Sequence, residues 1–182
     1  SANGGRLRFV RDVAGITMDS DDVERVDFNA LGGTDVVTVN DLTGTDVTSV
    51  NVDLAGAGGS GDGQPDNVIV NGTNGDDAIQ VNGDASGVQV SGLRAVLHLT
   101  NAEVPTDMLT INALGGNDVV EASGLAANAI SLTLDGGAGD DVLIGSAGSD
   151  ILFGRDGDDV LLGGPGQDVL DGGTGDNIVI QD

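Results

Sequence analysis

The sequence predicts an all-β chain in which short strands are wound into the stacked coils of a solenoid. Three observations support this fold class. Residues 136–180 repeat with a period of nine, short runs of β-branched and aliphatic residues recur along the rest of the chain, and no segment has the periodicity of an amphipathic helix. One such repeat cannot bury a core alone, so neighbouring repeats must stack.

Composition excludes several classes of function. The 182 residues include 32 Gly, and 30 acidic against 6 basic residues give a net charge of -24. Such a chain lacks the basic surface needed to bind nucleic acid or an anionic membrane. No apolar run reaches the ~20 residues of a transmembrane helix, and without Cys there are no disulfide bonds or zinc–thiolate sites. The apolar fraction of 38% still suffices for a core if the acidic excess is neutralised.

Residues 1–135 form the first predicted domain, an irregular β-solenoid. Segments 28–37, 70–79 and 111–120 share an apolar residue followed by Asn, and an Asp six positions after the Asn, at offsets of 42 and 41 residues. An offset near 41 predicts two coils of about 21 residues per repeat. Strands are expected at 36–39, 47–54, 67–71, 78–82, 87–91, 95–99, 108–112, 119–122 and 130–134.

The repeated Asn and Asp residues of these segments are candidates for structural ladders and for metal binding. The asparagines either line a turn as a partial ladder or simply favour turns; they are Asn29, Asn71 and Asn112. Asp118 lies 23 residues before Asp141, the length of one coil, so we expect their loops to stack and share an ion. Asp35 and Asp77 have no evident partner, and their role as metal ligands stays open.

The strongest pattern consists of five nonapeptides in unbroken register over residues 136–180: GGAGDDVLI, GSAGSDILF, GRDGDDVLL, GGPGQDVLD and GGTGDNIVI. Gly occupies the first and fourth positions throughout, and the eighth position is always Leu or Val. Gly permits a tightly curled loop that exposes carbonyl oxygens, and the sixth position adds a short carboxylate in four of the five units. Oxygen donors without nitrogen or sulfur are the ligands that calcium prefers. Each unit therefore predicts a calcium-binding loop followed by a short strand.

These nonapeptides resemble the RTX, or hemolysin-type, calcium-binding repeat family, whose pattern is G-G-x-G-x-D-x-U-x. The resemblance implies a parallel β-roll in which two nonapeptides make one turn and the U side chain points inward. It also implies the C-terminal part of a secreted bacterial β-solenoid protein. We therefore predict a right-handed parallel β-helix over residues 1–135 that runs without a break into a calcium-binding parallel β-roll over 136–182.

The resemblance also assigns the metal ligands. Asp141, Asp159 and Asn177 should stack on one edge of the roll, where Asp159 would serve two sites, and Asp150 and Asp168 should stack on the other edge. About three to five Ca²⁺ ions are expected, the last one bound more weakly because the Asn177 amide carries no charge. The further expected ligands are the upstream Asp118 and the loop carbonyls at Gly137, Gly139, Gly148, Gly157, Gly164, Gly166 and Gly175.

Two loops depart from the pattern at the second position, where Ser146 and Arg155 replace Gly. Both are tolerated if only the backbone carbonyl is needed at that position. Both are strained if the backbone must adopt a positive φ.

We expect an extracellular, non-catalytic module whose folding depends on calcium. Carboxylates on adjacent coils lie roughly 5 Å apart, and their repulsion opposes folding until a cation binds. Extracellular modules bind calcium with a Kd of ~10⁻⁴–10⁻³ M. No catalytic residue is predicted, because the sequence has no Lys, no Tyr, no H-E-x-x-H motif and one His, His98, in an alternating strand.

Two alternatives stay open. The first is a self-assembling filament or adhesin subunit that uses an apolar outer face of the roll. The residues of this face are Val142, Ile144, Val160, Leu162, Ile178 and Ile180. The second is the non-catalytic tail of a larger secreted enzyme that degrades polysaccharide or protein.

Overall fold

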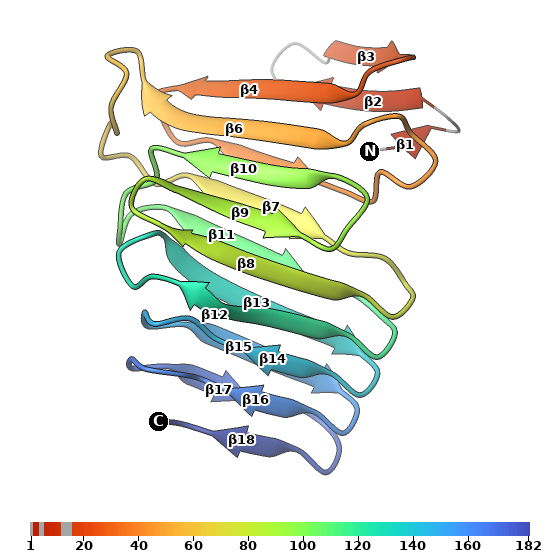
Figure 1. Ribbon diagram of the computed structural model, residues 1–182, viewed down its shortest axis with the longest axis vertical. Coiled ribbons are helices and arrows are strands. Elements are labelled where there is room, and N and C mark those ends of the chain that lie inside the picture. The colour runs from red at the N-terminus through yellow and green to blue at the C-terminus, as the bar shows by residue number, and fades with distance from the viewer. Residues whose placement is uncertain (1, 4–5, 12–15) are drawn as a thin grey trace.

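The structure is a computed structural model that describes residues 2–3, 6–11 and 16–182. Figure 1 shows strands stacked as successive rungs of one elongated solenoid, with the C-terminus in the last coil. The described residues form no helix, and so none that is long and apolar enough to cross a membrane. The prediction of an all-β fold with parallel coils is confirmed.

The described residues form eighteen strands, most of them short because a solenoid coil turns after each one. They are β1 (Ala2–Asn3), β2 (Arg6–Arg11), β3 (Ile16–Ser20), β4 (Arg25–Leu31), β5 (Val36–Val39), β6 (Ser49–Gly56), β7 (Asn67–Asn71), β8 (Ala78–Asp84), β9 (Gly87–Ser91), β10 (Val96–Thr100), β11 (Met108–Asn112), β12 (Val119–Leu125), β13 (Ser131–Ala138), β14 (Val142–Ile144), β15 (Ile151–Asp156), β16 (Val160–Leu162), β17 (Val169–Asp171) and β18 (Ile178–Ile180). β13 crosses the boundary predicted at residues 135/136, so the chain passes from one predicted domain to the other within a strand.

Two sheets face each other across the core. The nine-stranded sheet has the order β18-β16-β14-β12-β8-β9-β10-β6-β4, and the six-stranded sheet has the order β17-β15-β13-β11-β7-β5. Neighbouring strands are parallel except β9, which runs antiparallel to both β8 and β10. A small antiparallel sheet, β1-β2-β3, precedes the first coil and packs Leu7 against the core.

The coils are longest in the middle of the described chain and shortest at its C-terminal end. Pairing of β4 with β6 joins residues 24 apart, and pairing of β5 with β7 joins residues 31 apart. Pairing of β7 with β11 joins residues 41 apart, pairing of β11 with β13 joins residues 23 apart, and pairing of β13 with β15 joins residues 18 apart. The expectation that an offset of 41 covers two coils is therefore wrong. One coil is enlarged because the chain turns back through β9, and β10 then pairs with β6.

The core is filled by side chains at alternate strand positions. Leu143, Leu152 and Leu161 are 0% exposed, which confirms that the eighth position of the nonapeptide points inward. Burying one such side chain contributes about 1.5–3 kcal/mol. Val179 is 46% exposed because β18 is an edge strand. The seventh and ninth positions face outward and include the predicted apolar face. Its residues are half-buried in β14 and β16 and exposed in β18. Their use in assembly stays a prediction.

An asparagine ladder follows the six-stranded sheet. The Nδ2 atom of Asn112 donates to Oδ1 of Asn71 at 2.8 Å, and Asn71 donates in the same way to Asn40 at 2.8 Å. The expected third member, Asn29, lies instead in β4 of the nine-stranded sheet. The sequence around Asn29 matches the segments around Asn71 and Asn112, but its strand belongs to the opposite sheet.

Candidate metal centre

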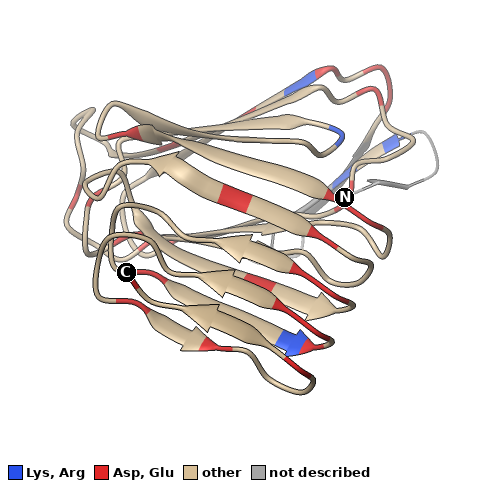
Figure 2. Ribbon diagram, turned by 60° about the horizontal axis from the view of Figure 1, so that its bottom comes forward, with Lys and Arg blue, Asp and Glu red and all other residues tan. Residues whose placement is uncertain are grey.

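Acidic residues precede successive strands of both sheets, and Figure 2 shows acidic segments recurring from coil to coil along the turns on one side. We call ladder 1 the residues that precede strands of the nine-stranded sheet: Asp77, Asp118, Asp141, Asp159 and Asn177. We call ladder 2 the residues that precede strands of the six-stranded sheet: Asp35, Asp66, Asp107, Asp150 and Asp168.

Each member of ladder 1 is tied to the next by the same hydrogen bond. The amide of Asp118 donates to Oδ1 of Asp141 at 2.8 Å, and the amide of Asp141 donates to Oδ1 of Asp159 at 2.9 Å. The ladder begins with the Asp77 amide, which donates to Asp118 at 2.7 Å, and ends with the Asp159 amide, which donates to Asn177 at 2.7 Å. The stacking expected from the spacing is present, and it occupies one oxygen of each acceptor.

The second carboxylate oxygen of three ladder 1 residues is buried without a hydrogen-bond donor among the described residues. It is the Oδ2 atom of Asp118, Asp141 and Asp159, whose exposed fractions are 0%, 1% and 0%. Burying an ionised carboxylate without a partner is strongly unfavourable. Arg155, the only basic residue in the nonapeptides, pairs with Asp135 at 2.6 Å instead. These oxygens therefore fit a cation that comes from outside the chain.

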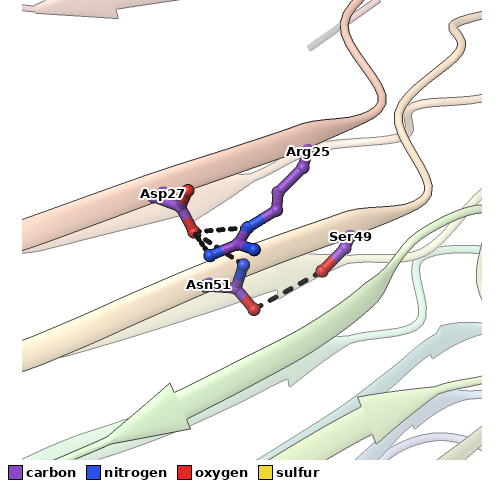
Figure 3. A network of polar contacts seen from close by, with 4 residues as sticks. All are labelled: Arg25, Asp27, Ser49 and Asn51. Carbon is purple, nitrogen blue, oxygen red and sulfur yellow. Dashed lines mark hydrogen bonds and ion pairs between the residues drawn. The ribbon is translucent and has the colours of Figure 1, made fainter.

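Burial shifts the titration of these carboxyl groups. It raises the pKa of Asp141 from 3.8 to about 6. The pKa values of Asp118 and Asp159 are also raised, first by burial and further by nearby carboxylates. Asp27 on the outer face shows the opposite behaviour (Figure 3), because donors from Arg25 at 2.8 Å and Asn51 at 2.7 Å lower its pKa. The chain thus supplies two donors to one oxygen of an exposed acid and leaves Oδ2 of Asp118, Asp141 and Asp159 without one.

The raised pKa of Asp141 predicts that acid stabilises the calcium-free protein. Its folded-state pKa of about 6 exceeds the unfolded value of 3.8, so the stabilisation is complete below 3.8 and is lost as the pH rises through about 6. We expect the β-type circular dichroism of chelated protein to increase as the pH falls from about 7 to about 5. With calcium present the trend reverses, because protons compete with the cation for the carboxylates. A steady acid-induced loss of structure in the chelated protein would contradict this assignment.

The first glycine of the Asp141 and Asp159 loops leaves space beside the carboxylate. A Cβ atom on Gly136 would lie 2.3 Å from Oδ2 of Asp141 and 2.9 Å from the carbonyl oxygen of Gly154. A Cβ atom on Gly154 would lie 2.3 Å from Oδ2 of Asp159 and 2.6 Å from the carbonyl oxygen of Gly172. Carboxylate and carbonyl oxygens from two coils therefore converge, and such hard donors suit calcium.

Filling this space should weaken calcium binding. We expect Gly154→Ala to raise the calcium Kd at least tenfold, about 1.4 kcal/mol, because the methyl group would displace both oxygens. Gly58→Ala is the control, since a Cβ atom there would meet no atom within 4 Å. Calorimetric titration of both variants measures the difference, and equal affinities would show that the space is unrelated to the cation.

The second loop position adopts a positive φ in most ladder 1 loops, even where the residue is not Gly. Arg155 has a φ of 85° and Leu114 a φ of 81°, matching the 102° of Gly137. Such a conformation costs a side chain roughly 1–2 kcal/mol. Of the two substitutions that the sequence left open, Arg155 is therefore strained, whereas Ser146 avoids a positive φ because its loop takes another shape.

The glycines whose carbonyls were predicted as ligands are divided between the loops of the two ladders. Gly148, Gly164 and Gly166 lie in ladder 2 loops, and the others lie in ladder 1 loops. All of them except Gly148 have a positive φ: Gly137, Gly139, Gly157, Gly164, Gly166 and Gly175. Gly148 belongs to the same loop as Ser146, so this loop differs at two positions. Coordination by these carbonyls stays a prediction.

Ladder 2 uses the same hydrogen bond but is interrupted. The Asp150 amide donates to Oδ1 of Asp168 at 2.9 Å, and the Asp66 amide donates to Oδ1 of Asp107 at 3.1 Å. Ile130 precedes β13 and takes the intervening position, so Asp150 has no acidic neighbour on that side. The predicted pair of Asp150 and Asp168 is thus assembled on the opposite sheet from ladder 1.

Asp66 and Asp107 were not among the predicted ligands, and Asp35 had no predicted partner. Asp66 and Asp107 are 41 residues apart, the same offset that links Asp77 with Asp118, so the signal was present. Asp35 precedes β5 and donates its amide to Oδ1 of Asp66 at 2.8 Å. It therefore belongs to ladder 2, although its local sequence resembles that of ladder 1.

Comparison with protein families identifies the C-terminal loops. A model described as the RTX calcium-binding nonapeptide repeat, in four copies, matches residues 133–161 and 144–179. Residues 133–179 are RTX calcium-binding repeats. The RTX repeats contain ladder 1 from Asp141 to Asn177, while Asp118 continues the same hydrogen-bonded series outside the match. Comparison with curated proteins and with solved structures gives no match.

Proposed function

We propose that ladder 1 holds calcium ions between successive coils and that binding them folds the C-terminal part of the solenoid. The observation that carries this proposal is the buried Oδ2 atom without a donor in Asp118, Asp141 and Asp159. The residues that would hold the ions are the pairs 118/141, 141/159 and 159/177, together with the loop carbonyls. This arrangement predicts three ions on one edge.

Electrostatic repulsion explains why folding would depend on the ions. Charged groups on neighbouring strands lie about 5 Å apart, and at an effective dielectric constant of ~20 each pair repels by about 3 kcal/mol. Asp141 is flanked by Asp118 and Asp159, so it is repelled from both sides. Bound calcium supplies positive charge to these carboxylates, and its binding free energy then becomes folding free energy.

The ladder position of Asn177 predicts that the last site is the weakest. Its Oδ1 accepts the hydrogen bond from Asp159 just as a carboxylate would, but the amide brings no negative charge. Affinity for calcium falls with the number of charged ligands. The site between Asp159 and Asn177 should therefore fill last.

We further propose that the chain is an extracellular, non-catalytic structural module. The proposed sites have only oxygen ligands, and the carboxylates of neighbouring coils repel each other until calcium binds. We expect Kd values of ~10⁻⁴–10⁻³ M, as in extracellular calcium modules. The match to RTX repeats supports the same setting. His98 lies exposed on β10, a strand that follows neither a ladder 1 nor a ladder 2 residue, which supports a module without catalysis.

Calorimetric titration and native mass spectrometry test the calcium proposal. We expect three calcium ions per chain and much weaker binding of Mg²⁺, because the smaller ion demands a near-ideal octahedral shell and retains its waters. Absence of bound calcium at about 10 mM, roughly tenfold above the weakest expected Kd, would refute the proposal.

A further inference from the structure

We infer that a serine or threonine at the second position of a loop closes that loop to calcium, so that the Asp150–Asp168 pair of the RTX repeats stays metal-free. The inference rests on the proposed function of ladder 1 and specifies which loops take part in it. Calcium would then load one edge of the roll only, from Asp118 onward.

Ser146 supplies to Asp150 the contacts that the ladder 1 carboxylates lack. Its amide donates to Oδ2 of Asp150 at 2.5 Å, and its hydroxyl donates to Oδ1 at 2.9 Å. The same hydroxyl accepts from the amide of Gly148 at 2.9 Å, which holds it in place. Ser146 and Asp150 are each 2% exposed. Asp150 is therefore as buried as Asp141, yet both of its oxygens have donors.

Thr73 repeats this geometry in a loop far from Ser146 in the sequence. Its amide donates to Oδ2 of Asp77 at 2.7 Å, and its hydroxyl lies 3.0 Å from the same oxygen. The amide of Gly75 is bonded to the hydroxyl at 3.1 Å, as Gly148 is to Ser146. In both loops the second-position amide and hydroxyl therefore contact the carboxylate, although only Ser146 reaches both of its oxygens.

The loops that leave a carboxylate oxygen without a donor have no hydroxyl at this position. The buried oxygens belong to Asp35, Asp118, Asp141 and Asp159. The corresponding second-position residues are Leu31, Leu114, Gly137 and Arg155. All four of these have a positive φ, whereas Ser146 and Thr73 do not. The amide of Glu103, at the second position of its loop, also donates to Oδ2 of Asp107 at 2.8 Å without a positive φ. The open oxygen therefore goes with a positive φ at the second position, and the hydroxyl of Ser146 or Thr73 adds a further donor to a loop closed by its amide.

The partner of Asp150 is also satisfied by the protein. Oδ1 of Asp168 accepts the amide of Asp150 at 2.9 Å, and Oδ2 accepts Nε2 of Gln181 at 2.8 Å. Hydrogen bonds to a charged acceptor contribute about 1.5–3 kcal/mol each. A cation at this pair would have to displace the donors of Ser146, whereas a cation at ladder 1 displaces none from Oδ2.

Two carboxamide substitutions in the RTX repeats test the inference by counting bound calcium with native mass spectrometry. Asp141→Asn and Asp150→Asn each remove one charge from an equally buried residue. Both keep an oxygen that can accept an amide hydrogen bond, from Asp118 at position 141 and from Ser146 at position 150. We expect Asp141→Asn to lose the two ions it shares with its neighbours, and Asp150→Asn to retain all three. Asp168→Asn, at a half-buried position, makes the same comparison if Asp150→Asn does not fold.

Ser146→Gly tests the cause. Removing the hydroxyl and restoring the repeat pattern should open the loop, and we expect one additional calcium ion per chain. An unchanged ion count in Ser146→Gly, or the loss of an ion in Asp150→Asn, would overturn the inference while leaving calcium binding by ladder 1 intact. A wild-type chain that binds no calcium would instead refute the proposed function.

Discussion

Chelating calcium at neutral pH is expected to unfold the coils that contain β12, β14 and β16. Each of these strands follows a ladder 1 carboxylate whose second oxygen is buried without a donor. A site saturated a hundredfold above its Kd stabilises the folded state by about 2.7 kcal/mol. Three such sites contribute about 8 kcal/mol, which is comparable to the whole stability of a typical domain, about 5–15 kcal/mol. Hydrogen exchange should show amides of these strands protected in calcium and exchanging at least a hundredfold faster in chelator.

The control lies in the same molecule. β6 and β10 belong to coils with buried Val50, Val52 and Leu99, and neither strand follows a residue of either ladder. Their amides should stay protected in chelator, because their packing does not depend on a cation. Equal protection of β14 and β6 in chelator would show that the RTX coils fold without calcium.

Replacing Asp159 with Asn is the second change with a large expected effect. Asp159 is 0% exposed and lies between Asp141 and Asn177 in ladder 1, so it contributes to two of the three proposed sites. Asn177 shows that an amide fits the ladder, so the variant keeps the hydrogen bond from Asp141. We expect two of the three calcium ions to be lost and the calcium-dependent rise in the thermal midpoint to fall by more than half.

Asp158→Asn is the matched control, since it removes the same charge from the neighbouring residue. Asp158 is exposed, and its Oδ1 accepts the amide of Asp176 at 2.7 Å, which an amide oxygen can also do. This variant should bind three ions with little change in stability. If the two variants lost calcium equally, general negative charge rather than ladder 1 would account for binding.

The sequence predicted the C-terminal coils well because their length is constant. Two nonapeptides make a coil of 18 residues, so Asp141 and Asp159 stack at the interval at which the pattern repeats. Upstream, the coils differ in length, and an offset of 41 fits one long coil as well as two short ones. The hairpin through β9 decides between them, and strand pairing between distant segments is not encoded in any local pattern.

The site was only partly predictable for a related reason. Asp35 and Asp118 follow nearly identical segments, yet they precede strands of opposite sheets. The repeat pattern puts Ser146 at the second loop position. It does not predict whether the backbone there has a positive φ, and so whether the serine is strained. The contacts of Asp150 depend on a loop conformation that has no positive φ at Ser146, and only the three-dimensional arrangement shows it.

A crystal structure of the calcium-saturated protein, with anomalous scattering used to locate calcium, tests the central claim most directly. We predict anomalous peaks between successive coils in contact with the Oδ2 atoms of Asp118, Asp141 and Asp159. Ordered water alone at these three oxygens in saturating calcium would contradict the account.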